Sequence, residues 1–142
     1  MTPSAHKFIG PATFAALTGR SVVTDTFDSG FPLGAHIELA RTADLICVAP
    51  ATANFLAKAA CGISDDLLST LYLCFTGPTI IAPAMNCEMW NHSAVQRNLK
   101  QLIDDGVQCI DPQEGWLSCR TRGVGRMASP EDIAEAIIER LK

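Results

Sequence analysis

Four polar residues have side chains and surroundings that suit chemistry: His36 in GAHIELA, Asn54 in PATANF, Asn86 in PAMNCEMW and Cys119 in SCRTRGVGRM. A histidine titrates near neutral pH, so His36 is able to take or hold a proton. The Asn86 amide offers N–H donors that suit a substrate carboxylate. A thiol in a polar, glycine-bearing segment is a candidate proton donor. Together these residue types favour proton transfer beside a bound carboxylate.

Each of these residues also has a structural alternative. A lone histidine is more often a surface or capping residue than a catalyst. Asn54 could cap or solvate the first turn of the helix that follows it, and Asn86 could be a turn residue. Both asparagines, however, follow predicted strands, and the carboxyl ends of parallel strands are where ligands of such sheets bind. Position therefore favours a functional role for them.

The six cysteines, at positions 47, 61, 74, 87, 109 and 119, form no CxxC pair and have no histidine at zinc-like spacing. Neither a metal site nor a disulfide framework is indicated, and reduced thiols fit the cytoplasm. Most of them lie in apolar runs such as DLICVA and LYLCF, which predicts small buried hydrophobes. Cys119 differs, because Arg120, Arg122 and Arg126 are close in sequence and predict a lowered thiol pKa.

Short apolar runs at residues 45–49, 79–82 and 107–110 predict buried strands. Helical spacing separates them, in TANFLAKAAC, DDLLSTLYLCF and an AVQRNLKQLIDDG segment that closes on Gly106. A last helix opens at Ser129 as its cap and runs to Leu141. Residues 11–17 and the HIELART segment are also helix-like. This alternation predicts an α/β fold with a parallel sheet and helices on both faces.

Two segments, residues 25–35 and 111–129, are rich in polar residues, glycine and proline and predict long loops that leave room for a site. The start of the chain is unusual for a doubly wound fold, which normally opens with an apolar strand and a phosphate-binding turn. Residues 1–9 instead resemble the loop after a second strand. The sequence therefore predicts a fold that lacks the first strand and phosphate loop.

Composition limits the class of protein. With 142 residues, 48% of them hydrophobic, the chain predicts one domain over residues 1–142. The net charge of -4, with scattered Lys and Arg, argues against nucleic acid as a partner. No apolar stretch is long enough to span a bilayer, and the first residues do not resemble a signal peptide. The expectation is a cytoplasmic protein without a membrane partner.

Taken in order, the GAHIELA, VAPATANFLAKAACG, APAMNCEMW and SCRTRGVGRM segments resemble the phosphopantothenoylcysteine decarboxylases. Their relatives include the peptidyl-cysteine decarboxylases of lantibiotic synthesis, and the resemblance covers nearly the whole chain. It implies a flavodoxin-like (Rossmann-like) three-layer sandwich that binds FMN and assembles as a homotrimer or a multiple of three. The implied reaction is decarboxylation of 4′-phosphopantothenoylcysteine to 4′-phosphopantetheine, in coenzyme A biosynthesis.

The resemblance also implies residue roles. His36, Asn86 and Cys119 would be catalytic, with His36 as base or orienting group, Asn86 on the carboxylate that leaves, and Cys119 as proton donor. FMN would contact Ser4, Thr52, Ala53, Asn54, Phe55 and Ala84. Phe55 stands where the family usually has Thr, so only its backbone would take part. The substrate would contact Asn86, Trp116, Ser118, Arg126 and Met127.

One departure concerns the flap around Cys119, which reads Ser118-Cys119-Arg120-Thr121 where the family usually has Ala-Cys-Gly-Asp. The conformation of this flap therefore stays open at the level of sequence. Two alternative functions also stay open. One is a peptidyl-cysteine decarboxylase with the same flavin chemistry, and the other is a non-catalytic flavodoxin-like regulatory or binding subunit. Intact His36, Asn86 and Cys119 speak against the second.

Overall fold

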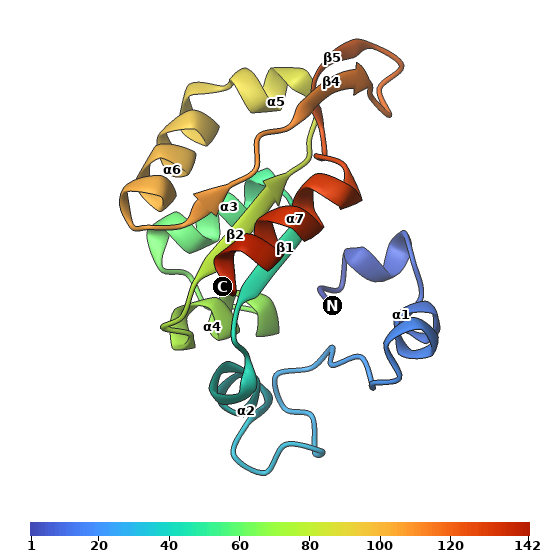
Figure 1. Cartoon of the computed structure of the whole chain (residues 1–142), viewed down its shortest axis with the longest axis vertical. Helices are drawn as coiled ribbons and strands as arrows, with labels where there is room; N and C mark the ends of the chain where they lie inside the picture. The colour runs from blue at the N-terminus through green and yellow to red at the C-terminus, as the bar shows by residue number, and fades with distance from the viewer. The chain divides into compact units, whose positions relative to one another are not determined.

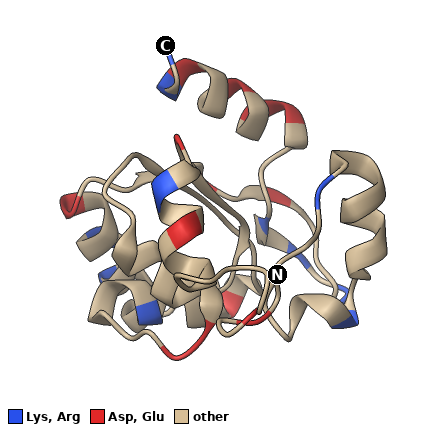
Figure 2. Ribbon diagram, turned by 90° about the horizontal axis from the view of Figure 1, so that it is seen from below, with Lys and Arg blue, Asp and Glu red and all other residues tan.

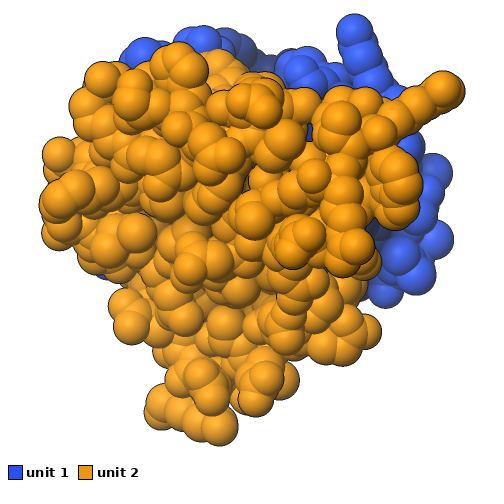
Figure 3. Space-filling view, turned by 90° about the horizontal axis from the view of Figure 1, so that it is seen from above, with its two compact units in different colours: residues 1–42, 63–76 blue, residues 43–62, 77–142 orange.

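The computed structural model describes all 142 residues, Met1 to Lys142. Contacts between residues divide the chain into two compact units, coloured separately in Figure 3. The first unit comprises residues 1–42 and 63–76, and the second comprises residues 43–62 and 77–142. The single domain over residues 1–142 stays a prediction.

The second unit is built on a three-stranded parallel sheet in the order β1-β2-β3. The strands are β1 (Ile46–Ala51), β2 (Thr79–Pro83) and β3 (Gln108–Cys109). Cys47 lies opposite Ile80, and Ile80 lies opposite Gln108. Every residue of the central strand β2 is buried, which explains its continuous apolar run. The predicted parallel sheet is confirmed.

Helices cover both faces of this sheet (Figure 1). In that view α7 (Pro130–Arg140) crosses in front of the strands, and α3 (Ala53–Cys61) lies behind them. On the α7 face, Ile133 packs in a buried cluster with Ala82 of β2 and Ala128. Behind the sheet, α3 packs against α6 (Ser93–Asp104), and Leu56 of α3 is fully buried. The predicted α/β layering is therefore present in this unit.

Local capping explains where two of these helices begin and end. The Ser129 hydroxyl accepts a hydrogen bond from the Asp132 N–H at 3.1 Å, as the sequence predicts for an N-cap. Acidic residues at the start of α7 and Arg140 in its last turn complement the helix dipole (Figure 2). Helix α6 ends before Gly106, whose φ of 92° suits glycine.

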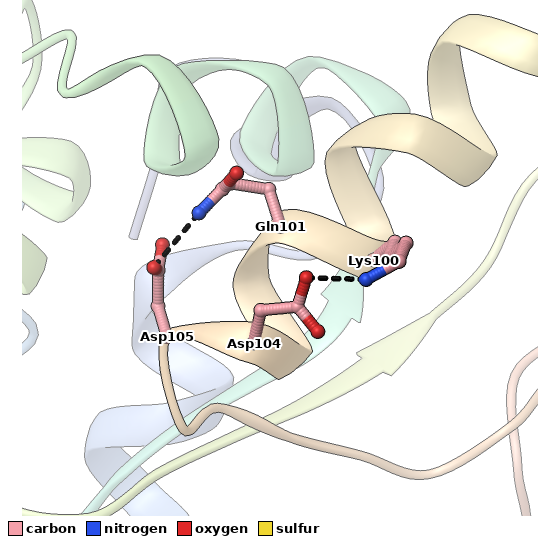
Figure 4. Close-up of polar contacts among 4 residues, drawn as sticks. All are labelled: Lys100, Gln101, Asp104 and Asp105. Atoms are coloured by element: carbon pink, nitrogen blue, oxygen red, sulfur yellow. Dashed lines mark hydrogen bonds and ion pairs between the residues drawn. The ribbon is translucent and has the colours of Figure 1, made fainter.

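The last turn of α6 is held by pairs four residues apart (Figure 4). Lys100 pairs with Asp104, and the Gln101 amide donates to Asp105 at 2.8 Å. All four side chains belong to a solvated surface, where each such pair contributes only a few tenths of a kcal/mol, about 0.3 to 0.5. We assign them a structural role.

The first unit contains helices and turns. Its elements are a 3-10 turn η1 (Ala5–Lys7) and the helices α1 (Pro11–Thr18), α2 (Ala35–Thr42) and α4 (Leu67–Cys74). Helices α2 and α4 pack against each other, and a capping box between Asp66 and Ser69 starts α4. The predicted helices are confirmed, each within a few residues of its expected bounds. No helix of the chain is long and apolar enough to cross a membrane.

Two expectations from the sequence are wrong. Residues 111–129 do not form a loop throughout, because β4 (Gln113–Trp116) and β5 (Arg122–Arg126) form an antiparallel hairpin. Both strands are polar and glycine-bearing, so they lack the apolar alternation that identifies a strand. The expectation that cysteines in apolar runs are buried is also wrong for Cys61 and Cys74. Both are exposed, at the last positions of α3 and α4.

Cys109 gives a prediction on alkaline stability. Burial raises the pKa of its thiol to about 12, and the nearby Asp111 carboxylate adds to the effect. The folded thiol keeps a proton that the unfolded one loses near its ordinary pKa, so the stability of the fold falls as the pH rises from about 9 towards about 12. Urea unfolding over this pH range should show that the free energy of unfolding falls more steeply with pH for the wild type than for Cys109→Ala. Equal slopes would contradict the shift.

Candidate functional site

The candidate site of the second unit lies at the carboxyl ends of β1 and β2. Thr52 follows β1 and caps α3, since its hydroxyl accepts a hydrogen bond from the Phe55 N–H at 3.2 Å. Asn54 therefore does not cap α3, but its side chain is exposed in the first helical turn, so the alternative that it solvates this turn still stands. Phe55 is only 6% exposed, so its side chain belongs to the core. The first N–H groups of α3 point out of the helix end.

The loop after β2 is tied to the end of β1. The Ala84 N–H donates to the Ala51 carbonyl at 3.0 Å, which brings the PAMN and PATAN segments together. Asn86 caps the short helix α5 (Cys87–Asn91), because its side-chain oxygen accepts from the Glu88 N–H at 2.8 Å. Asn86 is thus a helix cap and not the turn residue of its structural alternative. The amide nitrogen has two donors, one of which serves the Cys119 sulfur, so one remains for another partner.

The β4–β5 hairpin docks on this loop. The Met85 N–H donates to the Gly125 carbonyl at 2.9 Å. A Cβ at Gly125, where φ is 155°, would stand 2.2 Å from the Met85 carbonyl oxygen, and one at Gly123 would stand 3.0 Å from the Cys87 Cβ. Only glycine permits this approach of two backbones. The two glycines therefore position the hairpin against the Asn86 loop.

Gly125→Ala should push the hairpin off the loop. We expect a loss of about 3 kcal/mol or more in the free energy of unfolding, because the added methyl group meets backbone that has little room to move. The matched control is Gly106→Ala, whose φ is also positive but whose added Cβ would meet nothing within 4 Å. It should cost only about 1 kcal/mol. Equal losses in urea unfolding would contradict the proposed clash.

Cys119 lies at the tip of the hairpin, exposed to solvent. Its sulfur is 2.9 Å from the Thr121 hydroxyl oxygen. The pKa of the thiol is lowered, first by the hydrogen bond with the Thr121 side chain, and to a smaller extent by backbone hydrogen bonds and the Asn86 side chain. The predicted direction is thus confirmed, but the cause is not the arginines. The structure brings Cys119 and Asn86, two of the predicted catalytic residues, together.

His36 and Ser4 belong to the first unit. His36 follows Ala35 at the start of α2, and its Nδ1 is buried without a hydrogen-bond partner. Gly34, with φ at 97°, packs directly beneath the imidazole ring, since a Cβ there would lie 3.3 Å from its Cε1. Ser4 precedes η1, and its side chain makes no capping bond. A shared role of these residues with Asn86 and Cys119 stays a prediction.

The predicted substrate residues differ in their surroundings. Trp116 ends β4 with 75% of its surface exposed, and Ser118 is exposed in the turn. Arg126 ends β5 and passes beside Gly115, where a Cβ would lie 3.0 Å from its Cδ. Met127 packs against the buried Ala82, Ala128 and Ile133 cluster. Met127 therefore has a packing role and is half-buried, whereas the other three are exposed, and the substrate contacts of all four stay predictions.

Comparison with known proteins decides the family. The family model described as Flavoprotein matches residues 1–142. The chain belongs to the Flavoprotein family. Within it, the chain is 50% identical over 136 residues to the coenzyme A biosynthesis bifunctional protein CoaBC of Bacillus subtilis, covering 95% of this chain and 34% of the relative. The chain thus spans about a third of the length of the curated relatives that it matches.

Solved structures agree with this membership of the Flavoprotein family. The FMN-dependent cysteine decarboxylase SpaF matches all of this chain and 78% of its own, with a TM-score of 0.84 and 40% identity. A PPC decarboxylase mutant complexed with pantothenoylaminoethenethiol matches 73% of this chain and 58% of its own, with a TM-score of 0.72 and 39% identity. The flavodoxin-like α/β fold and the family that the four segments indicate are confirmed.

Proposed function

We propose that this chain catalyses the FMN-dependent decarboxylation of 4′-phosphopantothenoylcysteine to 4′-phosphopantetheine, a step of coenzyme A biosynthesis. The proposal makes it a carboxy-lyase. The observation that carries it is the meeting of the Asn86 amide and the Cys119 thiol at the carboxyl edge of the sheet. The relationship to coenzyme A biosynthesis proteins and to a PPC decarboxylase supports the choice of substrate.

The donor set at the start of α3 fits FMN. The Ala53 and Asn54 N–H groups are the first two of the helix and have no partner within it, and the Asn54 amide is exposed beside them. The Ala84 N–H is used by Ala51, so only its carbonyl is available. When bound, FMN supplies the temporary electron acceptor without which the cysteine carboxylate, whose amine is held in an amide, has no route to release CO2.

The chain's own residues would then divide the work. The Asn86 amide nitrogen donates to the substrate carboxylate and holds it for departure. Cys119 gives its proton to the substrate when the double bond of the enethiol is reduced, and the resulting thiolate keeps the hydrogen bonds that lower its pKa. His36, with its unpartnered Nδ1, takes or orients a proton. Trp116, Ser118 and Arg126 close over the substrate from the hairpin.

The test is to incubate the purified protein with FMN and phosphopantothenoylcysteine, and to follow CO2 release and product mass together. The proposal expects equal amounts of CO2 and phosphopantetheine with no net consumption of oxidant. Binding of FMN is measured separately by titration. An Asn54→Ala variant should bind FMN more weakly, by about fivefold to tenfold, as expected for one lost hydrogen bond. If the protein binds FMN but releases no CO2, the proposed activity is wrong, and a non-catalytic regulatory or binding subunit is the alternative that remains.

A second candidate is decarboxylation of a peptide that ends in cysteine. It is favoured by the fit of SpaF, which covers the whole chain with a higher TM-score than the PPC decarboxylase does. Both candidates share the flavin chemistry and differ in what the hairpin must enclose. Competition between phosphopantothenoylcysteine and a short peptide with a C-terminal cysteine decides between them, through the ratio of their kcat/KM values.

The assembly and the location belong to the same proposal. We expect a homotrimer or a multiple of three in the cytoplasm, acting on a small-molecule substrate. Two large apolar side chains of the first unit, Phe8 and Phe27, are about nine-tenths exposed in the single chain, and a subunit interface would cover such residues. Light scattering measures the state directly. A monomer at micromolar concentration would contradict this part of the proposal.

A further inference from the structure

The tip of the β4–β5 hairpin is a tightly closed turn. The Leu117 N–H donates to the Thr121 carbonyl at 2.9 Å, and the Arg120 N–H donates to the Leu117 carbonyl at 2.9 Å. Arg120, the residue before Thr121, adopts a left-handed conformation with φ at 62°, although it is not glycine. This pattern is that of a three-residue loop whose last residue is left-handed. It orients Cys119 and Thr121 towards each other across the turn.

Within that turn the sulfur of Cys119 and the hydroxyl oxygen of Thr121 are 2.9 Å apart. In the thiol state either atom can donate. In the thiolate state only the Thr121 hydroxyl has a proton, so the contact becomes a charge-assisted hydrogen bond and strengthens. A contact that is stronger for the anion favours release of the thiol proton. The Thr121 side chain thus acts on the protonation of Cys119.

The other groups around the sulfur act in the same direction but more weakly. Asn86 contributes a neutral amide from the loop after β2. Of the charged side chains in the hairpin, Arg122 is paired with Glu114 at 3.2 Å, so its charge is largely neutralised. Arg120 lies next to Cys119 in the chain, and Arg126 lies at the far end of β5 beside Gly115. Thr121 is therefore the side chain that lowers the thiol pKa most, and its hydroxyl contacts the sulfur at 2.9 Å.

We propose that Thr121 is a positioning residue that holds the Cys119 sulfur and stabilises its thiolate, and so sets the acid strength of the proton donor. The inference rests on the proposed function, because only there does Cys119 give up a proton in each turnover. A better acid transfers its proton more readily, and a stabilised thiolate is the product of that transfer. The sequence alone does not single out Thr121, because the polar segment 111–129 predicts a loop without the turn that brings Thr121 to Cys119.

The test measures the acid strength of Cys119 without flavin or substrate. Alkylation by iodoacetamide is followed over a range of pH, and mass spectrometry of the Cys119 peptide separates it from the other five cysteines. In Thr121→Val, which keeps the shape and loses the hydroxyl, the midpoint should rise by about 0.5 to 1 pH unit. Thr121→Ser should retain the wild-type midpoint, and Thr121→Asp should raise it further through its negative charge.

Two controls keep the result interpretable. Thr13→Val makes the same change at an exposed position of α1 and should leave the Cys119 midpoint unchanged. The synthetic peptide SCRTR carries the same neighbours without the hairpin, and its midpoint should lie above that of the folded wild type. This second comparison needs no variant, so it holds even if Thr121→Val fails to fold.

Three outcomes would overturn the proposal: an unchanged midpoint in folded Thr121→Val, a midpoint in Thr121→Ser as high as in Thr121→Val, or a wild-type midpoint no lower than that of the peptide. Because the alkylation assay involves no catalysis, it tests the role of Thr121 independently of whether the proposed function is correct. In the active enzyme, Thr121→Val should lower kcat more than it changes KM, and should move the alkaline limit of the pH profile upward. A change in KM alone would contradict the role.

Discussion

Cys119→Ser should release CO2 from phosphopantothenoylcysteine in a single turnover and then stop, with the enethiol as the accumulated product. Phosphopantetheine formation should fall by at least about 100-fold, since a serine hydroxyl is a far weaker acid than the thiol and proton donation contributes about 100-fold to 10,000-fold. The hydroxyl still reaches Thr121, so the turn should keep its shape. The measurement combines CO2 release, flavin absorbance and product mass.

The matched control for this prediction is Cys74→Ser. Cys74 is also an exposed thiol, but it ends α4 in the other compact unit. Its replacement should therefore leave the rates of CO2 release and of phosphopantetheine formation unchanged. A loss of CO2 release in Cys119→Ser would mean that the thiol acts before decarboxylation. Phosphopantetheine at the wild-type rate would exclude Cys119 as the donor.

The sheet could be predicted from the sequence because burial dictates its composition. β2 is buried along its whole length, so apolar residues dominate it, and the run from Ile80 to Pro83 is visible without any partner. The hairpin could not be predicted in this way. Its strands are held by pairing with each other and by the approach of Gly123 and Gly125 to the PAMN loop, and neither interaction leaves a periodic apolar pattern.

The candidate site was predictable where position in the fold decides it. Asn86 directly follows a buried strand, so its place at the carboxyl edge follows from the topology. The electrostatics of Cys119 were not predictable from nearby arginines, because a contact at 2.9 Å with Thr121 outweighs charges that extend into solvent or pair with Glu114. The packing of Met127 against the Ala82, Ala128 and Ile133 cluster is likewise visible only in the structure, and its substrate role stays a prediction.

Asn86→Asp should block the first step of the reaction, the release of CO2 from the substrate. The amide nitrogen would be replaced by a second carboxylate oxygen, which repels the carboxylate of the substrate and offers it no donor. We expect CO2 release to fall by at least about 100-fold, the size of effect that follows loss of one positioned donor in an active site. The new charge beside Cys119 should also raise the pKa of that thiol, because a nearby anion disfavours the thiolate.

The fold should tolerate this change, which makes the kinetic result interpretable. Aspartate caps a helix as well as asparagine does, so the bond from the Glu88 N–H that starts α5 is retained. Asn91→Asp, at the other end of the same helix, adds the same charge without touching the Asn86–Cys119 contact and is the matched control. Asn86→Ser separates the two causes, since it removes the amide donors without adding a charge. If Asn86→Asp released CO2 at the rate of Asn91→Asp, the carboxylate would be held elsewhere and the assignment of Asn86 would be wrong.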